Sequence, residues 1–257
     1  MIHFYKYQGA GNDFILIDNR AQQTALTTEQ IALLCHRRFG IGADGLMLLE
    51  HAADHDFRMV YYNADGREST MCGNGGRCIT AFARHLGLVG DKAFFVAIDG
   101  EHHAQFTGEN IIALEMNEVH EIQHSDNFSI LNTGSPHYVV WTDDVAQTDV
   151  VHQGREIRNR DRFAPNGINV NFAQVIESGL YVRTYERGVE DETLSCGTGV
   201  TACAIAASKD QTGTFSTDIL TPGGKLNVSF TKDTAGSAVD VVLTGPAGFV
   251  FEGDVQL

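Results

Sequence analysis

The chain is poor in basic residues. Its 257 residues include 18 Lys and Arg against 33 Asp and Glu, which gives a formal net charge of −15. A protein that binds nucleic acid or an anionic membrane surface needs a basic patch to contact the phosphates, and this sequence contains none. The sequence also lacks an apolar run that approaches the length of a membrane span, and its N-terminal residues carry no cleavable signal pattern. We therefore expect no nucleic-acid partner, no membrane association and a cytoplasmic location.

The cysteines do not form a structural framework. Five cysteines are an odd number, and they show no disulfide spacing for a chain this long, so we expect free thiols in a reducing compartment. Cys72 and Cys78 are six residues apart, and Cys196 and Cys203 are seven apart, which is wider than the close pair of a zinc knuckle. We therefore expect no metal site, and we expect Cys35, Cys78 and Cys203 to be buried core thiols.

Other ligand-binding patterns are missing too. The segment 9–11 precedes Asn and Asp instead of a helix with a basic residue, so it does not resemble a phosphate-binding loop. His51 and His55 have the spacing of helical metal ligands, but they lie in an acidic, loop-like stretch without a third ligand nearby. We expect these two histidines to be solvated, and we expect the pair His102-His103 to be exposed.

One short pattern is present twice. The segments 72–75 (CGNG) and 196–199 (CGTG) each combine a cysteine, two glycines and a small polar residue, and small and apolar residues follow both. The pattern predicts a cysteine at the N-terminus of a buried helix, where unpaired N–H groups and the positive dipole end favour a thiolate and bind a carboxylate. Two such cysteines facing each other would form an acid/base pair. The alternative is two glycine-rich turns before core helices, with cysteine as a small hydrophobic residue.

Further matches follow in the same order at a nearly constant separation of about 124 residues. They pair residues 11–17 with 134–140, 38–39 with 162–163, 45–48 with 169–172, and 62–63 with 185–186. This register indicates an internal duplication, so we predict two similar lobes, residues 1–118 with Cys72 and residues 119–257 with Cys196. In an alternative division the last residues return to the first lobe. The polar segment 118–129 is the predicted junction.

The apolar periodicity predicts a mixed α/β fold that is rich in strands, with one long buried helix in each lobe. The predicted strands cover residues 14–17, 45–49, 57–61, 94–98, 138–141, 168–173, 180–185 and 239–243. The predicted helices cover residues 28–39, capped by Thr27 or Thr28, and residues 75–85 and 199–209.

Six motifs follow one another over nearly the full length of the chain. They are GAGNDF at 9–14, GIGAD at 40–44, NADG at 63–66, MCGNG at 71–75, YERG at 185–188 and CGTG at 196–199. With them the chain resembles the diaminopimelate epimerases. The resemblance implies two pseudo-symmetric α/β lobes, each a strand-rich half-barrel around a central helix, with the active site in the cleft between them. It also implies cofactor-free interconversion of LL- and meso-diaminopimelate for lysine and peptidoglycan precursor biosynthesis, usually by a homodimer.

A two-base route suits such a reaction, since one group removes the α proton and another delivers a proton to the opposite face. Cysteine suits both roles, because its free pKa of about 8.5 falls to roughly 3.5–7.5 at a helix N-terminus, so that a thiolate and a thiol coexist near neutral pH. We therefore assign these exchanging roles to Cys72 and Cys196. The reacting carboxylate is expected to bind the backbone N–H groups of Gly73, Asn74, Gly197 and Thr198.

Recognition of the second amino-acid end of the substrate needs an anion and a cation. Glu186 and Arg187 offer both charges on adjacent residues, although such a pair alone is equally typical of a strand end at the surface. By resemblance, His137 and Glu186 assist near the cysteines. The resemblance places at the substrate site Asn12, Asn63, Asn169, Glu186 and Arg187.

Two positions depart from the common pattern of the family. Gly45 stands where many members carry glutamine, so a substrate contact is lost or replaced by water. Ser135 stands where many members carry asparagine, and its hydroxyl can still donate and accept a hydrogen bond. We expect these changes to affect affinity and substrate preference and to leave the catalytic assignment intact.

Two other functions fit part of the pattern. A proline or hydroxyproline racemase of the same architecture usually carries histidine where Asn74 stands, and its chain is longer. A non-catalytic dithiol switch would join two facing cysteines in a disulfide on oxidation, which we also expect as an inactivating side reaction of an epimerase. Uptake of solvent deuterium at the substrate α-carbon distinguishes these functions.

Overall fold

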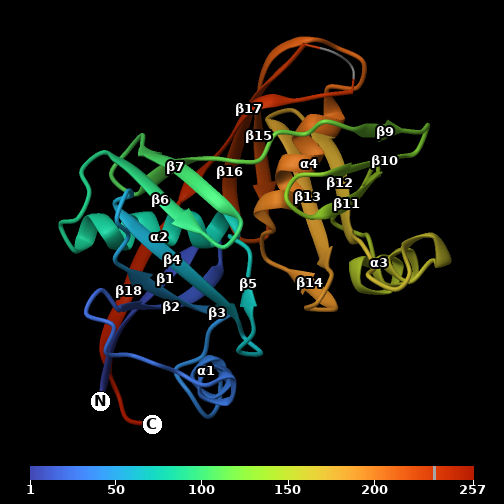
Figure 1. Cartoon of the computed structure of the whole chain (residues 1–257). Coiled ribbons are helices and arrows are strands. Elements are labelled where there is room, and N and C mark those ends of the chain that lie inside the picture. The colour runs from blue at the N-terminus through green and yellow to red at the C-terminus, as the bar shows by residue number, and fades with distance from the viewer. Residues whose placement is uncertain (234–235) are drawn as a thin grey trace. The chain divides into compact units, whose positions relative to one another are not determined.

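The computed structural model describes residues 1–233 and 236–257, and the chain divides into two compact units. The first unit combines Met1–Leu114 with Gly245–Leu257, and the second contains Glu115–Thr244. The last strand of the chain thus pairs with the first strand, within the first unit (Figure 1). Among the described residues, no helix is both long enough and apolar enough to cross a membrane.

One layer of strands organises the first unit. In spatial order the strands are β18 (Gly248–Val255), β1 (Ile2–Gly9), β2 (Asn12–Asp18), β3 (Gly45–Glu50), β4 (Phe57–Asn63), β6 (Lys92–Ala97), β7 (Gly100–Phe106) and β8 (Ile111–Glu115). The β2–β3 and β4–β6 pairs are parallel, and the other neighbours are antiparallel. The short strand β5 (Glu68–Ser69) pairs with β4.

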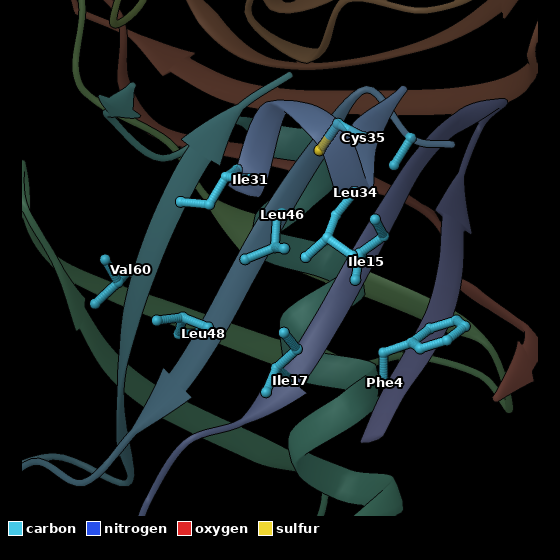
Figure 2. Close-up of a cluster of buried hydrophobic side chains, with 10 residues drawn as sticks. Phe4, Ile15, Ile17, Ile31, Leu34, Cys35, Leu46, Leu48 and Val60 are labelled. Carbon is cyan, nitrogen blue, oxygen red and sulfur yellow. The ribbon is translucent and has the colours of Figure 1, made fainter. Parts of the chain in front are cut away.

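Two helices cover the two faces of this layer. Figure 2 shows side chains of α1 (Thr28–Cys35) packed against one face, in a cluster that includes Phe4, Ile15, Ile17, Ile31, Leu34, Cys35, Leu46, Leu48 and Val60. The alternate residues Tyr5 and Tyr7 contact Phe82 of α2 (Gly73–His85), with ring centroids 4.8 and 5.9 Å apart. Because both faces are buried, β2 and β3 are nearly continuous apolar runs.

The second unit has its own layer of strands. Their spatial order is β9 (Ile122–His124), β10 (Phe128–Asn132), β11 (Pro136–Trp141), β12 (Asn169–Ile176), β13 (Gly179–Glu186), β15 (Gly213–Thr221), β16 (Gly224–Lys232) and β17 (Val239–Pro246), with β14 (Asp191–Thr193) on β13. The apolar helix α4 (Gly197–Ala207) contacts strands β10, β11, β12, β13, β15 and β16. Helix α3 (Val150–Arg158) packs on β12 and β13, and a short 3-10 helix (Asp161–Phe163) follows it.

The two layers repeat the same connections. In each unit, successive strands pair in the same order: antiparallel, parallel, antiparallel and parallel. The long buried helix lies in the connection that leads to the last parallel strand. Short strands β5 and β14 occupy equivalent places. The expectation of a strand-rich α/β fold with two similar lobes, each with a central helix, is therefore confirmed.

Three predicted helices form, with different ends. The helix expected over 28–39 stops at Cys35, because His36 is extended and its Nδ1 accepts the N–H groups of Arg38 and Phe39 at 3.1 Å. Its start is confirmed at Thr27, which forms a capping box with Gln30. The helices expected from residues 75 and 199 begin two residues earlier, at Gly73 and Gly197, so that the cysteines themselves are the N-caps.

Two histidine expectations were wrong. His102 is 5% exposed, because the alternation of β7 turns it inward, and its Nε2 lies 3.2 Å from Asp99 Oδ1. The His55 side chain is 14% exposed and lies 3.1 Å from Glu101. His51 and His103 are exposed, as expected.

Candidate functional site

Both predicted cysteines occupy the N-cap of a long buried helix. Cys72 precedes α2 with φ −98° and ψ 134°, and Cys196 precedes α4 with φ −118° and ψ 110°. The carbonyls of the two cysteines accept the N–H groups of Gly76 at 2.7 Å and Val200 at 2.9 Å, which close the first turns. The preceding first-turn N–H groups have no partner inside the helix and leave a positive dipole end at each sulfur. Such a position favours the thiolate form of cysteine.

In the first unit, Asn12 contacts the sulfur of Cys72. The Cys72 thiol donates to Asn12 Oδ1, with 3.7 Å between sulfur and oxygen. The same oxygen accepts a hydrogen bond from Asn74 Nδ2 at 3.3 Å. Asn12 Nδ2 donates to Asp44 Oδ2 at 2.6 Å. Because Asp44 accepts and Asn74 donates, the amide of Asn12 has one favourable orientation, with its oxygen toward Cys72.

A charged network holds Asp44 in place. Arg37 Nη2 donates to Asp44 Oδ1 at 2.6 Å and to Asp13 Oδ1 at 2.7 Å. Lys6 Nζ lies 2.7 Å from Asp13 Oδ2 and also donates to the carbonyl of Gly42. Burial opposes ionisation of Asp13, but the hydrogen bonds from Arg37 and Lys6 lower its pKa to about 2. Asp13 is therefore ionised at neutral pH, and the network fixes the orientation of Asn12.

The buried side chain of Arg77 contacts the first turn of α2. It is fully buried and donates to the carbonyl of Gly73 at 3.2 Å, to Asn74 Oδ1 at 2.8 Å and to the carbonyl of Pro246 at 3.3 Å. Burial lowers the pKa of its guanidinium. Since Asn74 Oδ1 accepts from Arg77, its Nδ2 is left to donate to Asn12. The side chains of Cys72, Asn12, Asn74 and Arg77 thus form one connected group.

In the second unit, hydroxyl groups take the place of these amides. Cys196 is 7% exposed, and its sulfur lies 3.5 Å from Thr198 Oγ1. Thr198 Oγ1 lies 3.3 Å from Ser135 Oγ, and Ser135 Oγ lies 2.9 Å from His137 Nε2. Asn169 Nδ2 donates to the same Ser135 oxygen at 3.1 Å. Ser135 and Thr198 correspond to Asn12 and Asn74 in the duplication, so each cysteine has a polar pair at the same place.

His137 lies behind Ser135 and is fully buried. Its Nδ1 lies 3.0 Å from Asn171 Nδ2. Burial, together with the positive charge of Arg187, lowers the pKa of His137 to about 3. The imidazole is therefore neutral at physiological pH.

Of the predicted charge pair, the structure connects Arg187 to the same group through Asn169, and Glu186 contacts Thr193. Glu186 ends β13, and its Oε2 accepts a hydrogen bond from Thr193 Oγ1 at 3.0 Å. The backbone N–H of Arg187 donates to Asn169 Oδ1 at 2.8 Å, and its guanidinium donates to the carbonyl of Asn166 at 3.4 Å. Asn169 thus connects Arg187 to Ser135, and both side chains of the pair are half-buried.

Asn63 and Gly45 lie opposite each other on β4 and β3. Asn63 is exposed at the end of its strand, where its backbone N–H donates to the carbonyl of Arg67 at 3.0 Å. A Cβ at Gly45 would lie 2.6 Å from the ring of Tyr61 and 2.6 Å from the carbonyl oxygen of Tyr62. Tyr61 therefore fills the space that a longer side chain at position 45 would need.

The remaining thiols are core residues, as expected. Cys35, Cys78 and Cys203 are 3%, 0% and 0% exposed. Burial raises the pKa of Cys35 and of Cys78 to about 12, and it raises the pKa of Cys203 still further. These three thiols are therefore protonated near neutral pH.

Four residues that position the site were not predicted from the sequence: Arg37, Asp44, Arg77 and Asn171. Signals for three of them were present. Asp44 ends the GIGAD motif, Arg77 is a charge inside an otherwise small and apolar helix, and Asn171 is a polar residue inside an apolar strand. Buried polar residues need hydrogen-bond partners, so Arg77 and Asn171 each implied a polar neighbour.

Solved structures of low sequence identity share this architecture. A PhzF-family phenazine biosynthesis protein of Bacillus anthracis matches with a TM-score of 0.78 and 15% identity, over 100% of this chain and 99% of that chain. A probable proline racemase of Agrobacterium radiobacter K84 matches with a TM-score of 0.72 and 16% identity, over 100% and 93% of the two chains. The fold is therefore the two-lobed fold of PhzF-type and proline racemase-type proteins.

The family follows from the sequence comparisons. The model of the family described as diaminopimelate epimerase matches residues 4–120 and 129–250. A diaminopimelate epimerase of Flavobacterium psychrophilum is 52% identical over 251 residues, which cover 96% of this chain and 98% of the relative. A diaminopimelate epimerase of Chlorobaculum tepidum is 41% identical over 259 residues, which cover 97% and 99%. The chain belongs to the diaminopimelate epimerase family.

Proposed function

We propose that this protein interconverts LL- and meso-diaminopimelate, with Cys72 and Cys196 as the acid/base pair and without a cofactor. The observation that carries the proposal is the equivalent placement of the two cysteines, each at a helix N-cap of one unit, in a chain of the diaminopimelate epimerase family. One thiolate removes the α proton, and the other thiol delivers a proton to the opposite face of the carbon. After the reaction the two sulfurs have exchanged protonation states, so the reverse reaction uses the same groups.

The helix N-termini supply the electrostatic part of this mechanism. As the α proton leaves, negative charge grows on the neighbouring carboxylate of the substrate. Fixed N–H donors at that position stabilise the transition state more than the ground state. We assign this role to the backbone of Gly73, Asn74, Gly197 and Thr198, which form the first turns of α2 and α4.

We assign recognition of the distal amino-acid end to Glu186 and Arg187. A carboxylate and a guanidinium side by side match the ammonium and carboxylate groups of that end. Asn12, Asn63 and Asn169 add amide groups that donate and accept hydrogen bonds. His137 is fully buried behind Ser135, so we propose that it acts through Ser135 and Thr198 rather than on the substrate.

We also propose that the enzyme is a cytoplasmic homodimer that serves lysine and peptidoglycan precursor biosynthesis. Exposed apolar side chains support self-association, because Phe249, Val250 and Phe251 follow one another on β18 and are 45–51% exposed. Light scattering coupled to size-exclusion chromatography measures the assembly. A mass near 56 kDa, twice the 28.0 kDa of the chain, is expected, and a mass near 28.0 kDa contradicts the dimer.

The function is tested by solvent exchange. The protein is incubated under reducing conditions in deuterated water with diaminopimelate or with proline, and α-deuterium is measured by mass spectrometry. Exchange with diaminopimelate but not with proline is expected, and Cys72→Ala or Cys196→Ala should abolish interconversion of the isomers. Exchange with proline would support the racemase alternative. Absence of exchange with either amino acid would remove the proposed activity and favour a dithiol switch.

A further inference from the structure

The protonation of His137 is determined by its neighbours. His137 lies on β11 with Asn171 on the adjacent parallel strand β12, and Nδ1 of the imidazole is 3.0 Å from Asn171 Nδ2. On the other side of the ring, Nε2 is 2.9 Å from Ser135 Oγ. A neutral imidazole carries one proton, so one nitrogen donates and the other accepts.

The orientation of Asn171 decides which nitrogen accepts. Its Oδ1 accepts a hydrogen bond from Thr184 Oγ1 at 3.0 Å, and its Nδ2 also donates to the carbonyl of Tyr138 at 3.4 Å. A reversed amide would place its oxygen against that carbonyl oxygen. Asn171 Nδ2 is therefore a donor toward His137, whose Nδ1 accepts and whose Nε2 carries the proton.

The donor–acceptor order of the hydrogen bonds continues through the hydroxyls of Ser135 and Thr198 to the sulfur of Cys196. Ser135 Oγ accepts from His137 Nε2 and from Asn169 Nδ2, because Asn169 Oδ1 is occupied by the N–H of Arg187 at 2.8 Å. The single hydrogen of Ser135 then points to Thr198 Oγ1 at 3.3 Å. The hydrogen of Thr198 in turn points to Cys196 Sγ at 3.5 Å.

We propose that Asn171 is a positioning residue that fixes the Nε2–H tautomer of neutral His137 and thereby directs the Ser135 and Thr198 hydroxyls so that Thr198 donates a hydrogen bond to Cys196. A donor at the sulfur favours the thiolate, so Asn171 prepares Cys196 to act as a base. The catalytic consequence rests on the proposed function, whereas the hydrogen-bond direction does not.

The fold makes room for this chain of hydrogen bonds in one unit only. A Cβ at Gly199 would lie 2.3 Å from Asn171 Oδ1 and 3.3 Å from Cys196 Sγ, so the glycine allows the amide to reach its place beneath the start of α4. In the first unit the equivalent residues of His137 and Asn171 are Phe14 and Met47, both buried and apolar. The chain of hydrogen bonds that depends on the His137 tautomer is therefore specific to Cys196. The charged group that acts on His137 is Arg187, which opposes a second proton on the ring.

Two readouts test the proposal without substrate turnover. The first is the ¹⁵N spectrum of histidine-labelled protein, in which protonated and unprotonated ring nitrogens differ and a His137→Gln variant assigns the signals. The second is the pH dependence of Cys196 alkylation by iodoacetamide, followed by peptide mass mapping. Asn171→Asp replaces the amide donor by an acceptor of the same shape, and Asn159→Asp adds the same charge at an exposed helix end of the same unit as a control.

The wild type should show neutral His137 with the proton on Nε2 between pH 5 and 8. In Asn171→Asp the proton of His137 should move from Nε2 to Nδ1. The pH midpoint of Cys196 alkylation should rise by about one unit, which is a tenfold loss of thiolate at a given pH. Asn159→Asp should change neither readout.

Thr198→Val tests the last step independently, including the case in which Asn171→Asp fails to fold. It should raise the Cys196 midpoint by a similar amount and leave the His137 tautomer unchanged. The proposal is overturned by an Nδ1–H tautomer in the wild type, or by an unchanged Cys196 midpoint in Thr198→Val. Because neither readout uses diaminopimelate, these results are independent of whether the protein proves to be an epimerase.

Discussion

The duplication provides a matched pair of glycines whose substitution should have opposite effects. Gly75 and Gly199 are the third helical residues of α2 and α4 and stand 124 positions apart in the two copies of the motif. Replacing a helical glycine by alanine favours the helix by about 0.5–1 kcal/mol. This gain is common to both positions, so any difference between the variants reports on the surroundings of the added methyl group.

Those surroundings differ sharply. At Gly75 the new Cβ would lie 3.4 Å from Met47 Sδ and 3.6 Å from Met59 Cε, which are ordinary contacts with flexible side chains. At Gly199 it would lie 2.3 Å from Asn171 Oδ1, so the amide must move and its hydrogen bonds to Thr184 and His137 weaken. Overpacking of this kind costs about 1–3 kcal/mol, which exceeds the helical gain. We expect Gly75→Ala to stabilise its unit slightly and Gly199→Ala to destabilise its unit by about 1–2 kcal/mol.

Urea unfolding measures both effects. The chain has one tryptophan, Trp141 on β11 of the second unit, so its fluorescence reports on the unit that contains Gly199. Far-UV circular dichroism follows the backbone of both units, so a transition that it shows and the Trp141 fluorescence does not belongs to the unit that contains Gly75. A lower midpoint for Gly199→Ala with no decrease for Gly75→Ala is expected. Equal shifts in the same direction would contradict this expectation, because they would show that Asn171 does not occupy the space beside Gly199.

Three further predictions follow from the pKa shifts and the network around Asn12. The pKa of His137 is about 3 in the folded chain and about 6.5 in the unfolded chain. Between these pH values the unfolded chain binds one more proton, so the free energy of unfolding should fall as the pH falls from about 6.5 toward 3. His137→Gln should show a weaker loss over that range in urea titrations, and an identical pH dependence would contradict a buried neutral imidazole. Native protein treated with iodoacetamide at pH 8 should be modified at neither Cys35 nor Cys78, whose pKa values are about 12, and peptide mapping that finds either one labelled would contradict their burial. Asp44→Ala should release the amide of Asn12 and lower kcat/KM about 10-fold, equivalent to one hydrogen bond to a charged group, whereas unchanged steady-state kinetics would show that Asp44 does not fix Asn12.

The sequence predicted those parts of the structure that depend on local patterns. The motif at Cys72 and at Cys196 defined two helix starts within two residues, because glycine and small polar residues determine a helix N-terminus locally. The core thiols and eight of the described strands followed from apolar runs, whereas the other described strands were not predicted. Helix α3 was missed because its segment, 150–158, is polar on most of its surface and has no long apolar stripe.

What escaped prediction depends on strand register and on buried polar contacts. The side-chain contact between His137 and Asn171 requires β11 and β12 to be parallel in one register, which no local pattern specifies. The end of α1 depends on the ring of His36, which captures two backbone N–H groups. His102 was misjudged because an adjacent His-His pair reads as polar, although the alternation of a strand places one member of any such pair inside.

In the proposed mechanism two different groups handle the proton, and a single-turnover experiment in deuterated water distinguishes this mechanism from one with a single base. Enzyme in excess is mixed with LL-diaminopimelate, and the meso product is isolated before a second turnover and analysed by mass spectrometry. With two cysteines, the product should carry deuterium at the inverted carbon in essentially every molecule, because the donating thiol has exchanged with the solvent. Product that retains the original hydrogen would show that one group both removes and returns the proton, and the two-cysteine account would be wrong.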